Sequence, residues 1–231
     1  MKRFYKDVTV AQGGAGFGLR LDGRVVKTPA RAELVAPGSA LAEAIAEEWR
    51  AQGETIDPRS MPLTGLANAA IDRVAPDAAT FAAGLARYGE SDLVCYRAEG
   101  PANLVARHSE LWDPFVAWAR ARYDIELKVV TGIMHQPQPE ATLTRLAKAV
   151  AVRDAFDLAG LSPLVTVSGS LVIALALAER AFGLEKAWAA ASLDDQWQLD
   201  QWGEDAEAVA ALANRRRDFE AGARFLDLLA I

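Results

Sequence analysis

The sequence predicts an α+β fold with two domains, a small β-rich α+β domain over residues 1–75 and a larger α-helical bundle over residues 76–231. Turn-forming glycines and alternating apolar residues, which are typical of strands, concentrate in the first 36 positions. From residue 39 onward, the apolar residues mostly follow the period of a helix. The chain has 231 residues, of which 52% are hydrophobic, so it can bury a sizeable core.

The N-terminal strands are expected first. Apolar side chains alternate with charged ones over residues 4–10, as in a half-buried strand. A glycine-rich turn follows, and residues 16–28 have the pattern of a hairpin with Asp22-Gly23 as its two-residue turn. A short third strand is expected at residues 33–35.

The first helix is expected to begin at Ser39, which is a good N-cap residue. Leu41, Ile45 and Trp49 follow it on one helical face, and Gly53 fits the end of the helix.

Proline and aspartate positions predict the next helices. One helix should run from Pro62 to Val74, and Asp77 should cap another. Pro101 opens a long, aromatic-rich helix that Pro114 is expected to kink or divide.

One strand is expected among these helices, at residues 125–130, where isoleucine, leucine and valine cluster. Prolines exclude a helix from the loop that follows. The remaining helices are expected at residues 141–158, 163–182, 185–202 and 205–229.

Composition excludes several classes of protein. With 25 Lys and Arg against 31 Asp and Glu, the net charge is −6, which argues against a nucleic-acid partner. The single cysteine, Cys95, is expected to be a buried thiol, and His108 a solvated or capping side chain. His108 and His135 are the two histidines, too few to suggest a metal site.

Neither the start of the chain nor its longest uncharged run suggests membrane insertion. Residues 1–10 lack the apolar region of a secretory signal. The 21 uncharged residues between Asp157 and Glu179 are long enough to span a bilayer, but they include glycine, serine, threonine and proline. A buried core helix is therefore expected there, without stable membrane insertion.

No catalytic or cofactor motif is found. The glycines of residues 13–18 lead into a strand rather than a helix, so they do not form a phosphate loop, and no cofactor or small-molecule substrate is expected. The adjacent acids Glu47-Glu48 and Asp194-Asp195 leave one alternative open, an enzyme that uses a carboxylate pair in an inter-domain cleft.

Residues 192–208 hold six acids, two tryptophans and no base. One interpretation is an amphipathic helix that buries Leu193 and Trp197, with Trp202 as a third candidate for burial, and solvates the rest. The other is a protein-binding ridge, on which a tryptophan anchors a partner and the acids select a basic surface.

Five segments, taken in order, resemble one protein family. They are RFYKDVTV, LDGRVVKTP, LAEAIAEEWRAQGETIDPRSMPLTGLANAAID, SDLVCYRAEGPANL and DDQWQLDQWGEDAEA. Together they run from Arg3 to about Asp205 and are similar to ATP synthase mitochondrial F(1) complex assembly factor 2 and its bacterial relatives.

The resemblance implies a non-enzymatic chaperone that binds the unassembled α subunit of the ATP synthase catalytic head. It would shield an apolar surface of that subunit until the β subunit takes its place. The implied fold is a small N-terminal α+β domain with an orthogonal helical bundle. Eukaryotic relatives carry a presequence for the mitochondrial matrix; this chain starts at the family motif, so a bacterial, cytoplasmic member is expected.

The resemblance also indicates site residues. Trp49, in the family's EEW motif, is expected to fix its helix on the N-terminal domain. The partner-binding residues are expected in the acidic segment. The first candidates are Glu204, Asp205 and Glu207, and the second candidates are Asp194, Asp195 and Trp202.

Overall fold

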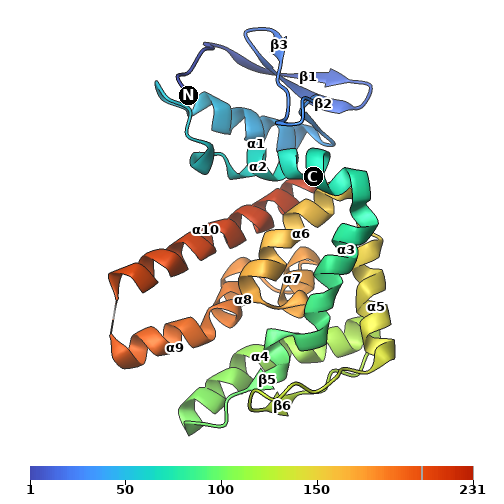
Figure 1. Ribbon diagram of the computed structural model, residues 1–231, viewed down its shortest axis with the longest axis vertical. Coiled ribbons are helices and arrows are strands. Elements are labelled where there is room, and N and C mark those ends of the chain that lie inside the picture. Colours follow the sequence, from blue (N-terminus) through green and yellow to red (C-terminus); the bar gives the residue numbers. More distant parts are fainter. Residues whose placement is uncertain (204, 231) are drawn as a thin grey trace. The chain divides into compact units, whose positions relative to one another are not determined.

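The structure, a computed structural model, describes residues 1–203 and 205–230. Strands come first and helices dominate afterwards, which confirms the α+β class (Figure 1). Two compact units can be distinguished. Unit 1 holds residues 1–78, 154–160 and 224–230, and unit 2 holds residues 79–153, 161–203 and 205–223. The expected domains, 1–75 and 76–231, stay a prediction.

Unit 1 contains a small antiparallel sheet in which β2 pairs with each of the other three strands. Asp22 (φ 48°) and Gly23 (φ 79°) form the turn between β2 and β3, which confirms the predicted hairpin, since a type I′ turn needs positive φ at both positions. The strands are β1 (Val8–Gly13), β2 (Gly16–Leu21), β3 (Arg24–Val25) and β4 (Val35–Ala36).

Gly16 is required where β2 approaches β4. Its φ is 131°, and a Cβ at this position would lie 2.4 Å from the carbonyl oxygen of Ala36. Any other residue would push the two strands apart.

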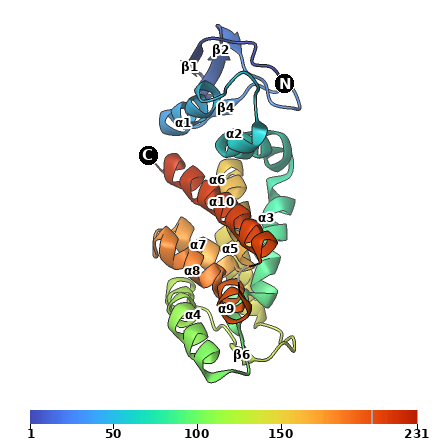
Figure 2. The ribbon, with the colours of Figure 1, turned by 90° about the vertical axis from the view of Figure 1, so that its left-hand side faces the viewer.

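Helix α1 (Ser39–Arg50) packs against the sheet (Figures 1 and 2). It buries Leu41 and Ile45, as their spacing predicts. The prediction that Ser39 is the N-cap is wrong, because the extended backbone of a cap falls one residue earlier, at Gly38, and no side chain caps the helix.

A nearly continuous helical run follows Met61. Helix α2 (Pro62–Ala69) passes through a π-helical turn (Ala70–Val74) and a 3-10 turn (Ala75–Asp77) into α3 (Ala78–Ala86). Asp77 lies in that 3-10 turn. The capping role expected for Asp77 stays a prediction.

Two segments from much later in the sequence complete unit 1. They belong to α6 (Ala155–Ser168) and α10 (Ala206–Leu229). The rings of Phe156 and Phe225 stack with their centroids 6.1 Å apart. Gly160 allows this approach, because a Cβ there would lie 2.8 Å from the Leu226 side chain.

The longest helix of the first half of unit 2, α4 (Ala102–Tyr123), contacts α7, α8 and α9. Pro114 lies inside it, and the helix continues on both sides. Pro114 therefore does not divide the helix, and the other expected outcome, a kink, stays a prediction. The packed side chains around it, including Trp112 and Phe115, hold the helix together despite the lost hydrogen bond.

Several other boundaries differ from the prediction. The strand expected at residues 125–130 is reduced to β6 (Val130–Thr131), paired in parallel with β5 (Tyr96–Arg97). The remaining helices are shorter than expected, except α10. They are α5 (Glu140–Ala151), α7 (Leu171–Ala178), α8 (Leu184–Ala191) and α9 (Leu193–Trp202).

The extra breaks arise at short polar residues. Asp154 accepts the backbone N–H of Asp157 at the start of α6, and Ser170 accepts that of Ile173 at the start of α7. These breaks divide the long uncharged run. Helix α7 is buried from Leu171 to Ala176, which confirms the core-helix interpretation, and no helix in the described ranges is long and apolar enough to cross a bilayer.

Candidate partner-binding surface

Helix α9 carries three of the residues expected to bind a partner, Asp194, Asp195 and Trp202. It buries Leu193 and Trp197 against unit 2, which confirms the amphipathic interpretation. Trp202, at its last position, is 80% exposed, so the expectation that this helix also buries Trp202 is wrong. An indole this exposed at the end of an ordered helix is unusual for a soluble protein and marks a candidate contact surface.

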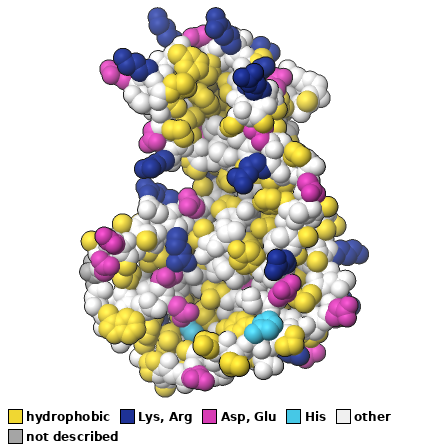
Figure 3. Space-filling view, in the orientation of Figure 1, with side chains coloured by type: hydrophobic (Ala, Val, Ile, Leu, Met, Phe, Trp, Pro, Cys, Tyr) yellow, Lys and Arg dark blue, Asp and Glu magenta, His cyan; other side chains and the backbone are white. Residues whose placement is uncertain are grey.

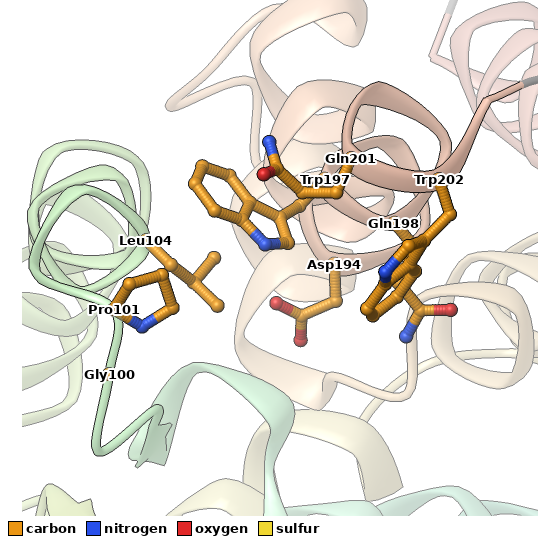
Figure 4. A pocket seen from close by; sticks show the side chains of 8 residues that line it. All are labelled: Gly100, Pro101, Leu104, Asp194, Trp197, Gln198, Gln201 and Trp202. Atoms are coloured by element: carbon orange, nitrogen blue, oxygen red, sulfur yellow. The ribbon is translucent and has the colours of Figure 1, made fainter.

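A pocket of about 490 Å³ opens beside Trp202 (Figure 4). Pro101 and Leu104, from the start of α4, line one side, and Trp197, Asp194 and Trp202 line the other. Gln198 and Gln201 also line it, so the walls combine apolar rings and Leu104 with two amides and one carboxylate, which suits an apolar side chain next to a basic one.

A second pocket, of about 280 Å³, is also lined by Trp202. Its walls are Leu199 of α9 and Ala208, Ala211 and Leu212 of α10, and Trp202 lines both pockets. Trp202 is therefore a ridge between two hollows that a partner could fill.

A third pocket, of about 460 Å³, lies beside the short β5–β6 pair. Asp194 lines this pocket as well as the first one. On its rim, Ile133 is 95% exposed and Met134 is 76% exposed. Apolar side chains are visible along the lower edge of Figure 3, over β5, β6 and α9, with carboxylates among them.

The three acids of α9 have different partners. Asp195 pairs with Arg215 at 2.8 Å, and Asp200 lies 3.3 Å from Arg107. Asp194 instead lies 2.7 Å from the Nε2 atom of His108. The two neighbouring carboxylates, Asp194 and Asp195, thus point to different partners and do not form the pair that acid–base catalysis would need.

His108 is buried, so the prediction of a solvated or capping histidine is wrong. Its ring stacks on Trp112 with centroids 4.0 Å apart. The backbone N–H of Ala98 donates to Nδ1, so the proton resides on Nε2, which donates to Asp194. Because the Trp112 indole donates to the carbonyl of Ala190, the network connects α4 to both α8 and α9.

Arg97 extends this network. Its guanidinium donates to the carbonyl of His108 at 2.7 Å and to Asp113 at 2.8 Å, and it lies over the Trp112 ring. The Arg97 side chain is 8% exposed, and burial lowers its pKa. We regard Arg97, His108 and Trp112 as the residues that support α9. The sequence pattern alone did not identify these three residues.

The two described acids at the start of α10, Asp205 and Glu207, are exposed. Glu204 lies outside the described residues. Asp205 accepts the backbone N–H of Glu207 at 3.2 Å, and Glu207 is exposed in the first turn of α10. The role of these acids in partner binding stays a prediction.

Trp49 lies in unit 1, half-buried against the N-terminal core, with its ring centroid 5.6 Å from that of Tyr5. The preceding acid, Glu48, accepts the backbone N–H groups of Leu63 and Thr64 and so caps α2. Glu47 pairs with Arg50 instead. The adjacent acids 47 and 48 therefore serve separate structural contacts, and the structural role of Trp49 stays a prediction.

The described residues contain no cluster of three or more His, Cys, Asp or Glu that could hold a metal ion. Cys95 is fully buried, as expected, and burial raises the pKa of its thiol to about 12. A thiol that stays protonated is a poor nucleophile.

Sequence reasoning also missed Ile133 and Met134. They are two large apolar residues in a loop rich in proline and glutamine, where no strand or helix pattern buries them. That contrast was the available signal, since an apolar pair in a polar loop has no core to enter.

Comparison with known proteins gives one consistent family. A family model described as ATP12 chaperone protein matches residues 2–120, more than half of the chain. The mitochondrial protein atp12 of Schizosaccharomyces pombe is 24% identical over 222 residues, covering 90% of this chain and 76% of that protein.

Two crystal structures are similar over nearly the whole chain. That of Atp12 from Paracoccus denitrificans is 39% identical, with a TM-score of 0.94, and the match covers 99% of this chain and 98% of that one. A protein from Agrobacterium tumefaciens is 42% identical, also with a TM-score of 0.94, and the match covers 99% of this chain and 86% of that one.

Proposed function

This chain belongs to the ATP12 chaperone family, and on that basis we propose that it acts in ATP synthase assembly by binding the unassembled α subunit of the catalytic head. It covers the surface of that subunit that later faces the β subunit, and it catalyses no reaction. An isolated subunit of a ring exposes an apolar interface, which makes a protective partner useful.

The observation that carries this proposal is the exposed Trp202 between two pockets. A rigid aromatic residue in the centre of a contact surface commonly supplies much of the binding energy. Asp205 and Glu207 lie close to it in the sequence, so the rim of this surface is acidic and favours a basic partner.

The relatives support a bacterial setting. The two bacterial proteins are 39% and 42% identical to this chain, whereas the mitochondrial protein of the yeast is 24% identical. We place the chaperone in the bacterial cytoplasm, where it would meet newly made α subunit; the eukaryotic relatives act in the mitochondrial matrix.

The direct test is capture of purified α subunit by the intact chain, measured by size-exclusion chromatography and titration calorimetry. We expect capture of free α but not of the assembled α/β ring, and no turnover of ATP by the chaperone. Trp202→Ala should weaken capture about tenfold or more. Val152→Ala, at a residue that is 75% exposed and lines none of the three pockets, is the control.

Failure of the wild-type chain to retain free α would refute the proposal. If the Trp202 variant captures α as tightly as the wild-type chain does, the binding surface lies elsewhere on the molecule.

A further inference from the structure

The pocket at the β5–β6 pair belongs to the same surface as the Trp202 ridge. Asp194 lines both this pocket and the one beside Trp202, so the two hollows meet at a single carboxylate. Ile133 and Met134 line the pocket at the β5–β6 pair, and Trp202 lines the other one. Each pocket therefore combines large apolar side chains with the carboxylate of Asp194, which Figure 4 shows facing the pocket beside Trp202.

The loop that carries the two apolar residues is held in place by hydrogen bonds. The backbone N–H of Gly132 donates to the carbonyl of Arg97 at 2.8 Å, next to the paired strands. The Gln138 side chain bonds to both the N–H and the carbonyl of Lys128, each at 2.9 Å. The Tyr96 hydroxyl lies 3.2 Å from the Nδ1 atom of His135.

Exposing large apolar side chains on an ordered loop is unfavourable in water. Ordering them in advance, however, reduces the entropy that a partner loses when it binds. Ile133 and Met134 therefore have the properties of a second anchor, in addition to Trp202.

Asp194 differs from the other acids of α9 because its hydrogen-bond partner is not an arginine. Asp195 and Asp200 each pair with an arginine. Asp194 instead accepts a hydrogen bond from the His108 ring. The other nitrogen of this ring accepts a backbone N–H, so the ring carries no positive charge. The Asp194 side chain is 46% exposed, and its second oxygen accepts no hydrogen bond from any described residue.

From these contacts we infer that the surface recognises a segment of the α subunit in which a lysine or arginine lies between two large apolar side chains. This inference rests on the proposed function and gives the chemistry of its recognition. One apolar side chain contacts Ile133 and Met134, the other contacts Trp202, and the basic group reaches the free oxygen of Asp194. An acidic residue at the central position is rejected, because it would meet that carboxylate.

The experiment has two arms, both with the intact chain. In the first, capture of purified α subunit is measured for a double variant, Ile133→Ser with Met134→Ser, and for Asp194→Asn, which keeps the oxygen that accepts from His108. We expect affinity to fall about tenfold for the double variant. For Asp194→Asn we expect weaker binding whose salt dependence is also flatter.

Matched controls are Val152→Ser, an exposed apolar residue outside the three pockets, and Glu185→Gln, an exposed acid that pairs with Arg216. Neither should change capture. If Trp202→Ala weakens capture but the Ile133/Met134 and Asp194 variants match wild type, the inference is wrong while the proposed function stands.

The second arm does not need the α subunit. Synthetic peptides with two leucines flanking a central lysine, at a series of spacings, are compared with the same peptides carrying glutamate. If α capture fails but a lysine peptide binds and Asp194→Asn abolishes that binding, the surface recognises this chemistry and the α subunit is the wrong partner. No preference for lysine over glutamate at any spacing overturns it.

Discussion

The Nε2 atom of His108 lies 2.7 Å from a carboxylate oxygen of Asp194, and this hydrogen bond joins a buried ring of α4 to the partly exposed acid of α9. The ring is fixed from two further sides, by the N–H of Ala98 and by the face of Trp112. The position of the candidate binding helix therefore depends on a side chain that is itself almost fully buried.

His108→Ala should destabilise the protein by about 3 kcal/mol, because it leaves the N–H of Ala98 and the carboxylate of Asp194 without their partner. Hydrogen exchange should show faster opening of α9 than in wild type. His108→Gln, which can still donate to Asp194, should recover much of the protection. Unchanged exchange in α9 for the alanine variant would mean that the bond does not position this helix.

Asp92 should make stability depend on pH. It is fully buried, it accepts bonds from the Ser170 hydroxyl and the N–H groups of Val172 and Val94, and burial raises its pKa from 3.8 to about 6. Between these values the native state binds the proton more tightly than the unfolded state does. The contribution of Asp92 to the free energy of unfolding is therefore full below pH 4 and falls by about 3 kcal/mol as the pH rises to 6.

The measurement is denaturant unfolding of wild type and Asp92→Asn between pH 4 and pH 7. Because asparagine does not titrate, the destabilisation caused by the substitution should shrink as pH rises through this window. A difference that stays constant, or that grows with pH, would contradict the raised pKa of Asp92.

Trp49 tests the expected structural role of the EEW motif. Trp49→Ala should lower stability by about 3 kcal/mol, through loss of the aromatic packing against Tyr5 and the N-terminal core. The indole N–H of Trp49 is buried without a hydrogen-bond partner among the described residues. Trp49→Phe should therefore lower stability much less. Thermal melting with α capture in parallel separates the roles: normal melting with lost capture would place Trp49 on the partner surface.

The acidic segment should act on association rate more than on stability. We expect the combined change of Glu204→Gln, Asp205→Asn and Glu207→Gln to slow capture of α and to flatten its salt dependence. Asparagine is chosen at position 205 because the Asp205 side chain accepts the N–H of Glu207, and an alanine there would remove this cap. Stopped-flow association at several salt concentrations is the measurement. Equal rates at all of them would leave these acids as a solvated helix end.

The sequence predicts this fold best where a local rule decides the structure. The Asp22-Gly23 turn and the buried face of α1 follow directly from residue type and spacing. It predicts helix breaks less well. Asp154 and Ser170 each cap the start of a new helix and so break the longer helices that were expected. Pro114 is tolerated inside α4 because the surrounding side chains pack tightly. These outcomes depend on tertiary contacts that residue spacing does not describe.

The candidate site shows the same division. The acidic, tryptophan-rich pattern identified α9, and Trp202 lies on its exposed end. The supports of that helix could not be found in this way, because Arg97 and His108 are polar residues that resemble surface positions in the sequence. Only the fold brings them beneath Asp194.

Unit 1 is assembled from three separate stretches of chain, and Phe225 in the last of them is fully buried in its core. During synthesis, a ribosome releases residues 1–78 long before it has made residues 224–230. The core of the sheet and its first helices therefore stays incomplete until the end of α10 has been synthesised. Part of their apolar surface is exposed to solvent during that time. Until then, the exposed apolar surface of the nascent N-terminal half is of the kind that general chaperones bind. For the same reason, loss of a few C-terminal residues would expose the N-terminal core to proteases.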